Sequence, residues 1–367
     1  MGRPPKERVE DEVSEDKFGA DDYDLFLSTS RDTLDGDVMG EVCVPKGHGT
    51  GSIKLDMGLT QAIPQGFIHE VYAQNGVGKT TLALEALGQA QKAGCRVAYL
   101  DLEGTLNKTL VASIRTLDIN KKDAQGNPLW IYKEGMIKSK DNPEDIRVMT
   151  GEEALKYVKL YCSMFKNSYI VVDSVDSIVP ANILEGKDIG DATMGSLGKL
   201  MTDAMRRLHG LCKKNNNTCI FINQIRDSLK MFGDPEATPG GKALGFYAFQ
   251  RLKLSKGGKA ANITDDNGKI IGHTVKVEFK KNKLPNTADN IEFNLIYGRG
   301  IDREQEIVDL GYQYGIIENW KEGDKVFKAM LNLEGQKIRD SKAATFLYEN
   351  PKISETIEQK VRKLLEI

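Results

Sequence analysis

The stretch Ala73-Gln-Asn-Gly-Val-Gly-Lys-Thr-Thr81 decides the fold. An apolar, β-prone run from Phe67 to Tyr72 precedes it, and the residues from Thr80 to Lys92 have the composition and apolar spacing of a helix. A strand, a glycine-bearing loop and a helix in this order are typical of a phosphate-binding loop, or P-loop. Glycines let backbone N–H groups close around phosphate oxygens, and the helix N-terminus adds positive potential. The stretch therefore predicts a nucleotide site.

Two polar residues of this loop have an expected partner. Lys79 is expected to reach the β- and γ-phosphates, and Thr80 to offer its hydroxyl to Mg²⁺. Ala73 stands where the strict pattern has its first glycine, and alanine is the smallest replacement. The alternative is a chance Gly-Lys-Thr at a strand–helix turn. The expected nucleotide-binding residues are Ala73, Gln74, Asn75, Gly76, Val77, Gly78, Lys79, Thr80 and Thr81.

Three further apolar runs end in polar residues. They are Arg96–Leu100, followed closely by Glu103, then Tyr169–Asp173, and then Thr218–Gln224. Apolar runs that alternate with helical stretches favour an α/β fold with a mainly parallel sheet flanked by helices. Ligands of such sheets lie beyond the carboxyl ends of the strands. We therefore expect Glu103, Asp173 and Gln224 to converge near the γ-phosphate.

A chemical role is available to each of these three residues. Asp173 matches the carboxylate that holds the Mg²⁺ shell, through water. Glu103 is placed to activate the attacking water. Gln224 can bond the γ-phosphate and lose that bond on hydrolysis, which would make it a sensor. The alternative for each is a solvated residue at a strand end or a helix N-cap.

Composition excludes several classes of protein. No run of 18 apolar residues occurs, and the N-terminus Met1-Gly-Arg-Pro-Pro-Lys6 lacks the apolar segment of a secretory signal. The five cysteines are scattered without a Cys-x-x-Cys, which favours buried, reduced thiols and a cytoplasmic location. The four histidines lack metal spacing, so no metal cage built by the protein is expected. With a net charge of −2, nucleic-acid binding must come from local basic patches.

The chain divides into four expected parts. Residues 1–21 are charged and predict a disordered leader. Residues 22–57 predict a short helix–strand arm, with strands at Glu41–Val44 and Ser52–Leu55, that either docks on a neighbouring subunit or covers its own sheet edge. Residues 58–300 form the α/β core, and residues 301–367 a small α-rich lobe with helices at Arg303–Gly311, Ser341–Asn350 and Lys352–Leu365.

Two long loops, at about 185–195 and 225–241, follow the Asp173 and Gln224 strands. Both contain cations, glycines and insertable apolar side chains, which a single-stranded nucleic acid could use. The alternative is a pair of mobile lids over the nucleotide. Further along, the lysine-rich segment Arg251–Lys283 predicts strands around a turn at Asp265-Asp-Asn-Gly268, and taken alone its lysines suggest a solvated sheet edge.

Taken together, these motifs resemble the bacterial RecA recombinase family, over about residues 40–367. The resemblance rests on the P-loop approach Leu59–Thr81, on Tyr169-Ile-Val-Val-Asp-Ser-Val175 and on Ile189-Gly-Asp-Ala-Thr-Met-Gly195. Later motifs match in the same order: Phe221–Arg226, Met231–Glu236, Gly240-Gly241, Lys281-Asn-Lys283, Tyr297–Ile301 and Val308–Gly311.

The resemblance implies an ATP- and Mg²⁺-dependent, DNA-dependent ATPase. Such a protein assembles as a helical filament on single-stranded DNA and pairs it with homologous duplex DNA, with loader or single-strand-binding proteins as possible helpers. It makes Glu103 the catalytic carboxylate and Gln224 the link to the DNA loops. Lys281 and Lys283 then act on the neighbouring subunit's γ-phosphate, which overrules the solvated-edge interpretation. Phe246 becomes a subunit contact. The implied DNA-binding residues are Met194, Gly195, Lys199, Arg206, Arg226, Lys230, Met231, Phe232, Gly240 and Gly241.

Several residues depart from the family pattern. Gly76-Val77 replaces a hydroxyl-rich pair, and Lys199 stands where arginine is usual. Asn107, the expected adenine contact, and Leu110 replace an acidic residue and a tyrosine. Two other functions stay open: a ring helicase with the same core, and a structural single-strand-binding protein that uses ATP only to assemble. The loops at 185–195 and 225–241 argue against the first, and intact Lys79, Glu103 and Asp173 against the second.

Overall fold

The computed structural model describes residues 46–60, 62–138, 144, 146–184, 195–227, 236–257, 261–284, 288–323 and 325–367, and they belong to one compact unit. The leader and the predicted strand Glu41–Val44 lie outside these residues.

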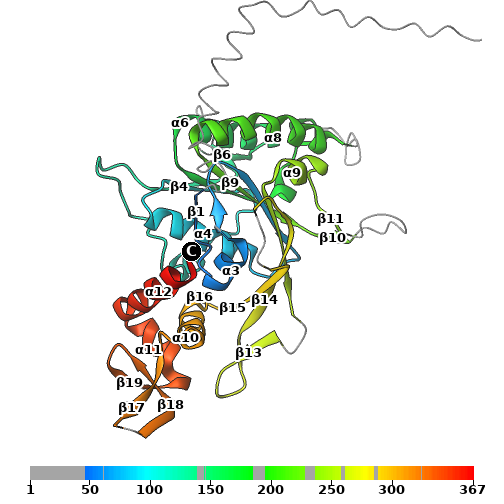
Figure 1. Cartoon of the computed structure of the whole chain (residues 1–367). Helices are drawn as coiled ribbons and strands as arrows, with labels where there is room; N and C mark the ends of the chain where they lie inside the picture. The colour runs from blue at the N-terminus through cyan, green and yellow to red at the C-terminus, as the bar shows by residue number, and fades with distance from the viewer. Residues whose placement is uncertain are drawn as a thin grey trace, which may run out of the picture. The chain divides into compact units, whose positions relative to one another are not determined.

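A ten-stranded sheet forms the centre of this unit (Figure 1). Its strands lie in the order β16 (Gly300–Ile301), β15 (Asn290–Ile296), β14 (Ile270–Asn282), β12 (Gln250–Lys256), β3 (Ile68–Ala73), β9 (Thr218–Gln224), β8 (Tyr169–Asp173), β4 (Val97–Asp101) and β5 (Trp130–Glu134), with β13 (Asn262–Thr264) paired to β14. The strands from β12 to β5 are parallel, and β14, β15 and β16 add an antiparallel edge. This confirms the predicted mainly parallel sheet.

The helices and short strands surround this sheet. The helices are α3 (Ile53–Leu59), α4 (Lys79–Lys92), α5 (Lys108–Ser113), α6 (Gly151–Met164), α7 (Ala181–Leu184), α8 (Ser196–Asn215), α9 (Lys242–Tyr247), α10 (Arg303–Gln313), α11 (Ala343–Glu349) and α12 (Pro351–Leu365), with 3-10 turns η1 (Val175–Ser177) and η3 (Asp340–Lys342). The short strands pair as β1 (Gly47–His48) with β2 (Ile63–Pro64), β6 (Met136–Lys138) with β7 (Ile146–Val148), and β10 (Arg226–Asp227) with β11 (Glu236–Ala237). None of the described helices combines the length and apolar character that a membrane crossing requires.

Alternating side chains on the parallel strands build two cores. On β8, Tyr169 and Val171 face the first core, which contains α4, whereas Ile170 and Val172 face the second core, which contains α6 and α8. Both faces are buried, which explains why these strands are uniformly apolar rather than alternating in sequence. In register, Ala73 pairs with Gln224 and Asp101 with Asp173, so the carboxyl ends of the parallel strands lie level.

The predicted strand at Ser52–Leu55 is wrong, because these residues begin helix α3. Ser52 caps the helix by accepting a hydrogen bond from the Leu55 N–H, 3.1 Å away. The apparent alternation arises because Ile53 packs in the C-terminal core and Leu55 in the first core, so two different cores bury one short helix. Asp56 of α3 also pairs with Arg362 of α12, 2.9 Å apart. The end of the predicted arm therefore packs within its own chain.

The C-terminal lobe contains the three predicted helices, as α10, α11 and α12, together with an antiparallel sheet that the sequence analysis missed. Its strands are β17 (Glu318–Glu322), β18 (Lys325–Leu333) and β19 (Gln336–Arg339). Leu331 and Leu333 of β18 pack with Ile307 and Leu347 in a third core. The outer strands β17 and β19 are rich in charged residues and bury few side chains, and this weakened the apolar pattern of the sheet.

Candidate nucleotide and DNA site

The P-loop joins β3 to α4. Strand β3 ends at the buried Ala73, and α4 begins at Lys79 after Gly78. Gly78 has a φ of 114°, and a Cβ there would lie 2.6 Å from Leu295 Cδ1, so glycine is required. Ala73 is not among the described residues with positive φ, which explains why alanine is accepted at that position. No side chain caps the start of α4, so its first N–H groups are open to an anion.

Lys79 lies at the centre of the loop. Its ammonium donates to the carbonyl oxygens of Gln74 at 2.9 Å and Ala73 at 3.3 Å. Burial lowers the pKa of Lys79, and the carboxylates of Asp173 and Glu103 oppose this shift. The open helix end and the buried ammonium suit a phosphate group.

Thr80 and Asp173 form the expected pair. The Thr80 hydroxyl donates to Asp173 Oδ2 at 2.8 Å, and the Tyr99 hydroxyl donates to the same oxygen at 2.5 Å. Burial raises the pKa of Asp173, while the hydrogen bonds from Tyr99 and Thr80 lower it. A hydroxyl beside a carboxylate offers the oxygen donors that Mg²⁺ prefers. The donor set therefore fits this ion, although its occupancy stays a prediction.

Glu103 and Gln224 meet beyond the strand ends, as the sequence analysis expected. Gln224 Nε2 donates to Glu103 Oε1 at 3.1 Å, and the Ser174 hydroxyl donates to the same oxygen at 2.5 Å. Ser174 was missed, although a polar residue directly after the Asp173 strand end could have drawn attention to it. Two donors thus fix one carboxylate oxygen and leave Glu103 Oε2 as the second acceptor.

Next to Gln224, a hydrogen-bonded network of polar side chains lies within the sheet. It consists of Asn223, Glu70 and Arg251, and we call it the anchor network. Asn223 Nδ2 donates to Glu70 Oε1 at 3.0 Å and to the Pro239 carbonyl oxygen at 3.1 Å. Arg251 Nε donates to Glu70 Oε2 at 2.6 Å. Glu70 and Asn223 are both wholly buried. The sequence signal was a pair of polar residues within otherwise apolar strands.

Helix α9 borders this network and carries Phe246, which is 73% exposed and thus available for a contact. The ammonium of Lys281, on β14, donates to the carbonyl oxygens of Gly245 at 2.9 Å and Phe246 at 2.7 Å. Lys283 is exposed, and its ammonium lies 5.9 Å from the centre of the Phe249 ring. Within one protomer, Lys281 therefore stabilises the carboxyl end of α9.

The described DNA-loop residues lie near the start of α8 and α9, apart from Arg206 in the middle of α8 and Arg226 on β10. Lys199 and Arg206 are exposed on α8, and Gly195 precedes that helix. Gly240 has a φ of 87°, and a Cβ there would lie 3.0 Å from Val175 Cγ1, so a larger residue would be strained. Gly241 lies at the N-cap of α9. Arg226 pairs with Ala237 in a short antiparallel ladder at the base of the second loop. Four predicted residues lie outside the described residues: Met194, Lys230, Met231 and Phe232.

Asn107 has a structural role that the sequence analysis did not weigh. Its Oδ1 accepts from the Leu110 N–H at 2.8 Å and caps α5. Asparagine is a preferred N-cap, so the residue type could have revealed this role. The side-chain amide still has donors, and an adenine contact stays a prediction.

The site combines a P-loop between a buried strand and a helix, a Thr–Asp pair beside it and a carboxylate at the same sheet edge. Together these features define a P-loop nucleotide-binding protein. The RecA N-terminal domain family matches residues 40–140 and 144–302. Over 320 residues, the chain is 36% identical to Protein RecA of Desulforapulum autotrophicum, covering 86% of this chain and 82% of that protein. It is 37% identical over 320 residues to Protein RecA of Laribacter hongkongensis, covering 85% and 80% of the two chains. It is also 36% identical over 323 residues to Protein RecA of Cytophaga hutchinsonii, covering 87% and 81%.

The chain therefore belongs to the RecA family. Its function is that of a RecA recombinase in DNA recombination and repair, and filament formation and strand exchange follow from the family. Family membership also implies nucleotide binding and binding of single-stranded DNA, and RecA proteins are generally ATPases.

Proposed function

We propose that this recombinase hydrolyses ATP with Mg²⁺ when it is assembled on single-stranded DNA, and that it pairs this strand with homologous duplex DNA. The observation that carries the proposal is that two hydrogen bonds hold the Glu103 carboxylate. Its Oε1 accepts from Gln224 at 3.1 Å and from Ser174 at 2.5 Å. A carboxylate held in this way beside a P-loop can orient a water molecule.

The residues of one protomer divide the work at the phosphates. Lys79 leaves the Gln74 and Ala73 carbonyl oxygens to bind the β- and γ-phosphates, whose charge offsets its burial. Thr80 and Asp173 would hold Mg²⁺, Thr80 through its hydroxyl and Asp173 through water. When bound, Mg²⁺ would neutralise phosphate charge. The N–H groups from Gly76 to Thr81 surround the same anion.

Gln224 connects hydrolysis to DNA. Its amide bonds Glu103 here and can instead bond a γ-phosphate, so it has two alternative acceptors. Its neighbour Asn223 holds the Pro239 carbonyl oxygen at the end of the second DNA loop, 3.1 Å away. A change at Gln224 therefore has a direct backbone route to that loop.

A neighbouring protomer completes the site. Lys281 donates to the carbonyl oxygen of the exposed Phe246, and Lys283 follows two residues later, so one subunit contact can deliver all three. A cation that reaches the γ-phosphate across an interface stabilises the transition-state charge and couples hydrolysis to assembly.

Joint-molecule formation tests this proposal. Labelled single-stranded DNA is incubated with supercoiled duplex, the full chain, Mg²⁺ and ATP, using homologous and heterologous pairs. We expect product only with the homologous duplex and ATP. DNA-stimulated hydrolysis without product would instead indicate a helicase or a requirement for a loader protein. The absence of both product and stimulated hydrolysis would identify an assembly-only protein and refute the proposal.

A further inference from the structure

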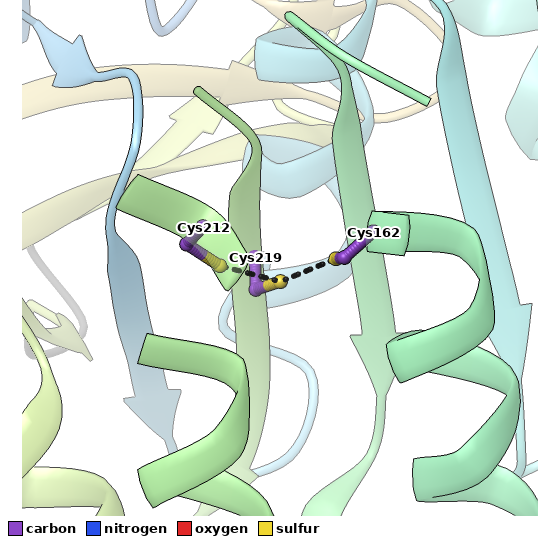
Figure 2. A group of neighbouring side chains, drawn as sticks. All are labelled: Cys162, Cys212 and Cys219. Carbon is purple, nitrogen blue, oxygen red and sulfur yellow. Dashed lines mark hydrogen bonds between the residues drawn. The ribbon is translucent and has the colours of Figure 1, made fainter. Parts of the chain in front are cut away.

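Three cysteines that are distant in sequence form one cluster in the second core (Figure 2). Cys162 comes from α6, Cys212 from α8 and Cys219 from β9. Cys219 Sγ lies 3.5 Å from Cys162 Sγ and 3.5 Å from Cys212 Sγ. All three side chains are wholly buried. The three thiols therefore face one another in a space closed to solvent.

All three thiols are free, with no disulfide between them. The packing around the cluster is apolar, with Ile170, Val158 and Leu208 in the same core. Asn215 and Asn217 come close, but both donate to the Cys162 carbonyl oxygen, at 2.8 and 2.7 Å, and so bind backbone rather than sulfur. Among the residues that the structure describes, the group of potential metal-ligand atoms holds these three sulfurs alone.

The number and spacing of the donors restrict the ion. Structural zinc takes four ligands, and here three are available. With ion–sulfur bonds of about 2.3 Å, trigonal-planar coordination separates the sulfurs by about 4.0 Å, and pyramidal coordination with angles near about 100° separates them by about 3.5 Å. Cys219 Sγ lies 3.5 Å from each of the other two sulfurs, and all three sulfurs lie within 4.8 Å of one another, so the two short separations suit the pyramid. An ion with a lone pair at the fourth position adopts this geometry.

Charge points to the same class of ion. Three thiolates with a monovalent ion leave two negative charges in the core, and with a divalent ion they leave one. A trivalent ion leaves none. Burial of an unpaired charge among apolar side chains is costly, so the neutral complex is strongly favoured.

We propose that Cys162, Cys212 and Cys219 form a binding site for a trivalent, thiol-seeking ion of the arsenic group, with arsenite as the probe. The reaction is a substitution without electron transfer: As(OH)₃ and three thiols give one arsenic atom bonded to three sulfurs and three water molecules. Each S–H proton leaves with one hydroxide, so no charge is created in the core.

The burial of the cluster sets the rate of this reaction. Arsenite reaches the sulfurs only when α6 or the end of α8 opens locally. We therefore expect binding to be slow, to become independent of arsenite concentration at high concentration, and to accelerate in urea well below the unfolding midpoint.

Mass spectrometry of the intact, folded chain tests the site. After incubation with arsenite, and separately after refolding in its presence, we expect one adduct whose mass equals one arsenic atom less three hydrogen atoms. Cys219→Ala should lose this adduct, because Cys219 contacts both other thiols. Cys95→Ala is the control, since Cys95 lies outside the cluster beside His48, 3.3 Å away. Thermal unfolding gives a second readout, because binding to the native state must raise the midpoint.

Each result decides the proposal. One adduct that depends on Cys219 but not on Cys95, with a raised unfolding midpoint, supports it. An adduct that persists in a folded Cys219→Ala variant, or no adduct after both native incubation and refolding, overturns it. Preferential binding of Zn²⁺ at the cluster would refute the assignment to a trivalent ion. Circular dichroism of both variants establishes that they are folded.

Discussion

Lys79 provides the most direct test at the scale of single residues. Its ammonium is buried and bound only to carbonyl oxygens of its own loop in the described structure, so its charge is available to phosphate. We expect Lys79→Ala to lower DNA-stimulated ATP turnover by at least about 100-fold, the usual effect of losing a key electrostatic contact. Lys92→Ala is the control on the same helix, because Lys92 is exposed and pairs with Glu355 at 2.7 Å. Near-normal hydrolysis in the Lys79 variant would refute the P-loop assignment.

We expect the protonation of Glu85 to make the free energy of unfolding depend on pH. Burial raises the pKa of this α4 carboxyl from 4.5 to about 7, although Thr116 donates a hydrogen bond to it. Between these pH values the unfolded chain releases the proton while the native state keeps it, so the free energy of unfolding falls as pH rises. Glu85→Gln should remove up to about 1.4 kcal/mol per pH unit of this slope.

Urea unfolding from pH 4.5 to 8 measures that slope, with Glu349→Gln on the exposed face of α11 as the matched control. An unchanged slope in the Glu85 variant would show that Glu85 is not the group responsible.

At the scale of elements, the anchor network joins β3, β9 and β12. Arg251→Met leaves the Glu70 carboxylate buried without its cation, and we expect the free energy of unfolding to fall by about 3 kcal/mol. Adding Glu70→Gln removes that charge and should recover much of the loss, whereas independent effects would add. Urea unfolding of the two single variants and the double variant measures the coupling. A double variant less stable than Arg251→Met would refute the ion pair as the link.

Elements with a strong local pattern were predictable from sequence. The strands Tyr169–Asp173 and Thr218–Gln224 appear with the predicted bounds, because both are continuous apolar runs buried on two faces. Ser52–Leu55 was mistaken for a strand because Ile53 and Leu55 enter different cores. Tertiary packing, and not local spacing, decided its conformation. The lobe's sheet was missed because its outer strands, β17 and β19, carry many exposed charges.

The candidate site follows the same division. Convergence of Glu103, Asp173 and Gln224 could be predicted, because parallel strands end at a common edge. The partners of Ser174, Glu70 and Arg251 could not, because they depend on which strands become neighbours, although the polar residue types themselves were a signal. The cysteine cluster is the clearest such case, since only the packing of α6, α8 and β9 brings its three thiols together.

At the scale of the whole molecule, a shared active site predicts rescue between variants. Lys283→Ala lacks the cation that we propose acts on a neighbour, and Glu103→Gln lacks the proposed catalytic carboxylate of its own site. Each variant alone should be nearly inactive, whereas a mixture should recover part of the DNA-stimulated ATP turnover, because some interfaces combine an intact Glu103 with an intact Lys283. Turnover is measured across mixing ratios. The absence of rescue at every ratio, with both variants still bound to DNA, would count against action across the interface.

The bond between Lys281 and the end of α9 has a consequence for how the cell's ATP is used. In a lone protomer this ammonium is held by the Gly245 and Phe246 carbonyl oxygens, on the helix that carries the exposed Phe246. If the lysine serves the next subunit, docking and delivery of the cation are a single event. Free protomers then stay idle even when saturated with nucleotide, and the last subunit of every filament is silent. The rate of ATP hydrolysis would thus depend on the number of subunit interfaces, so short filaments would hydrolyse less ATP per subunit than long ones.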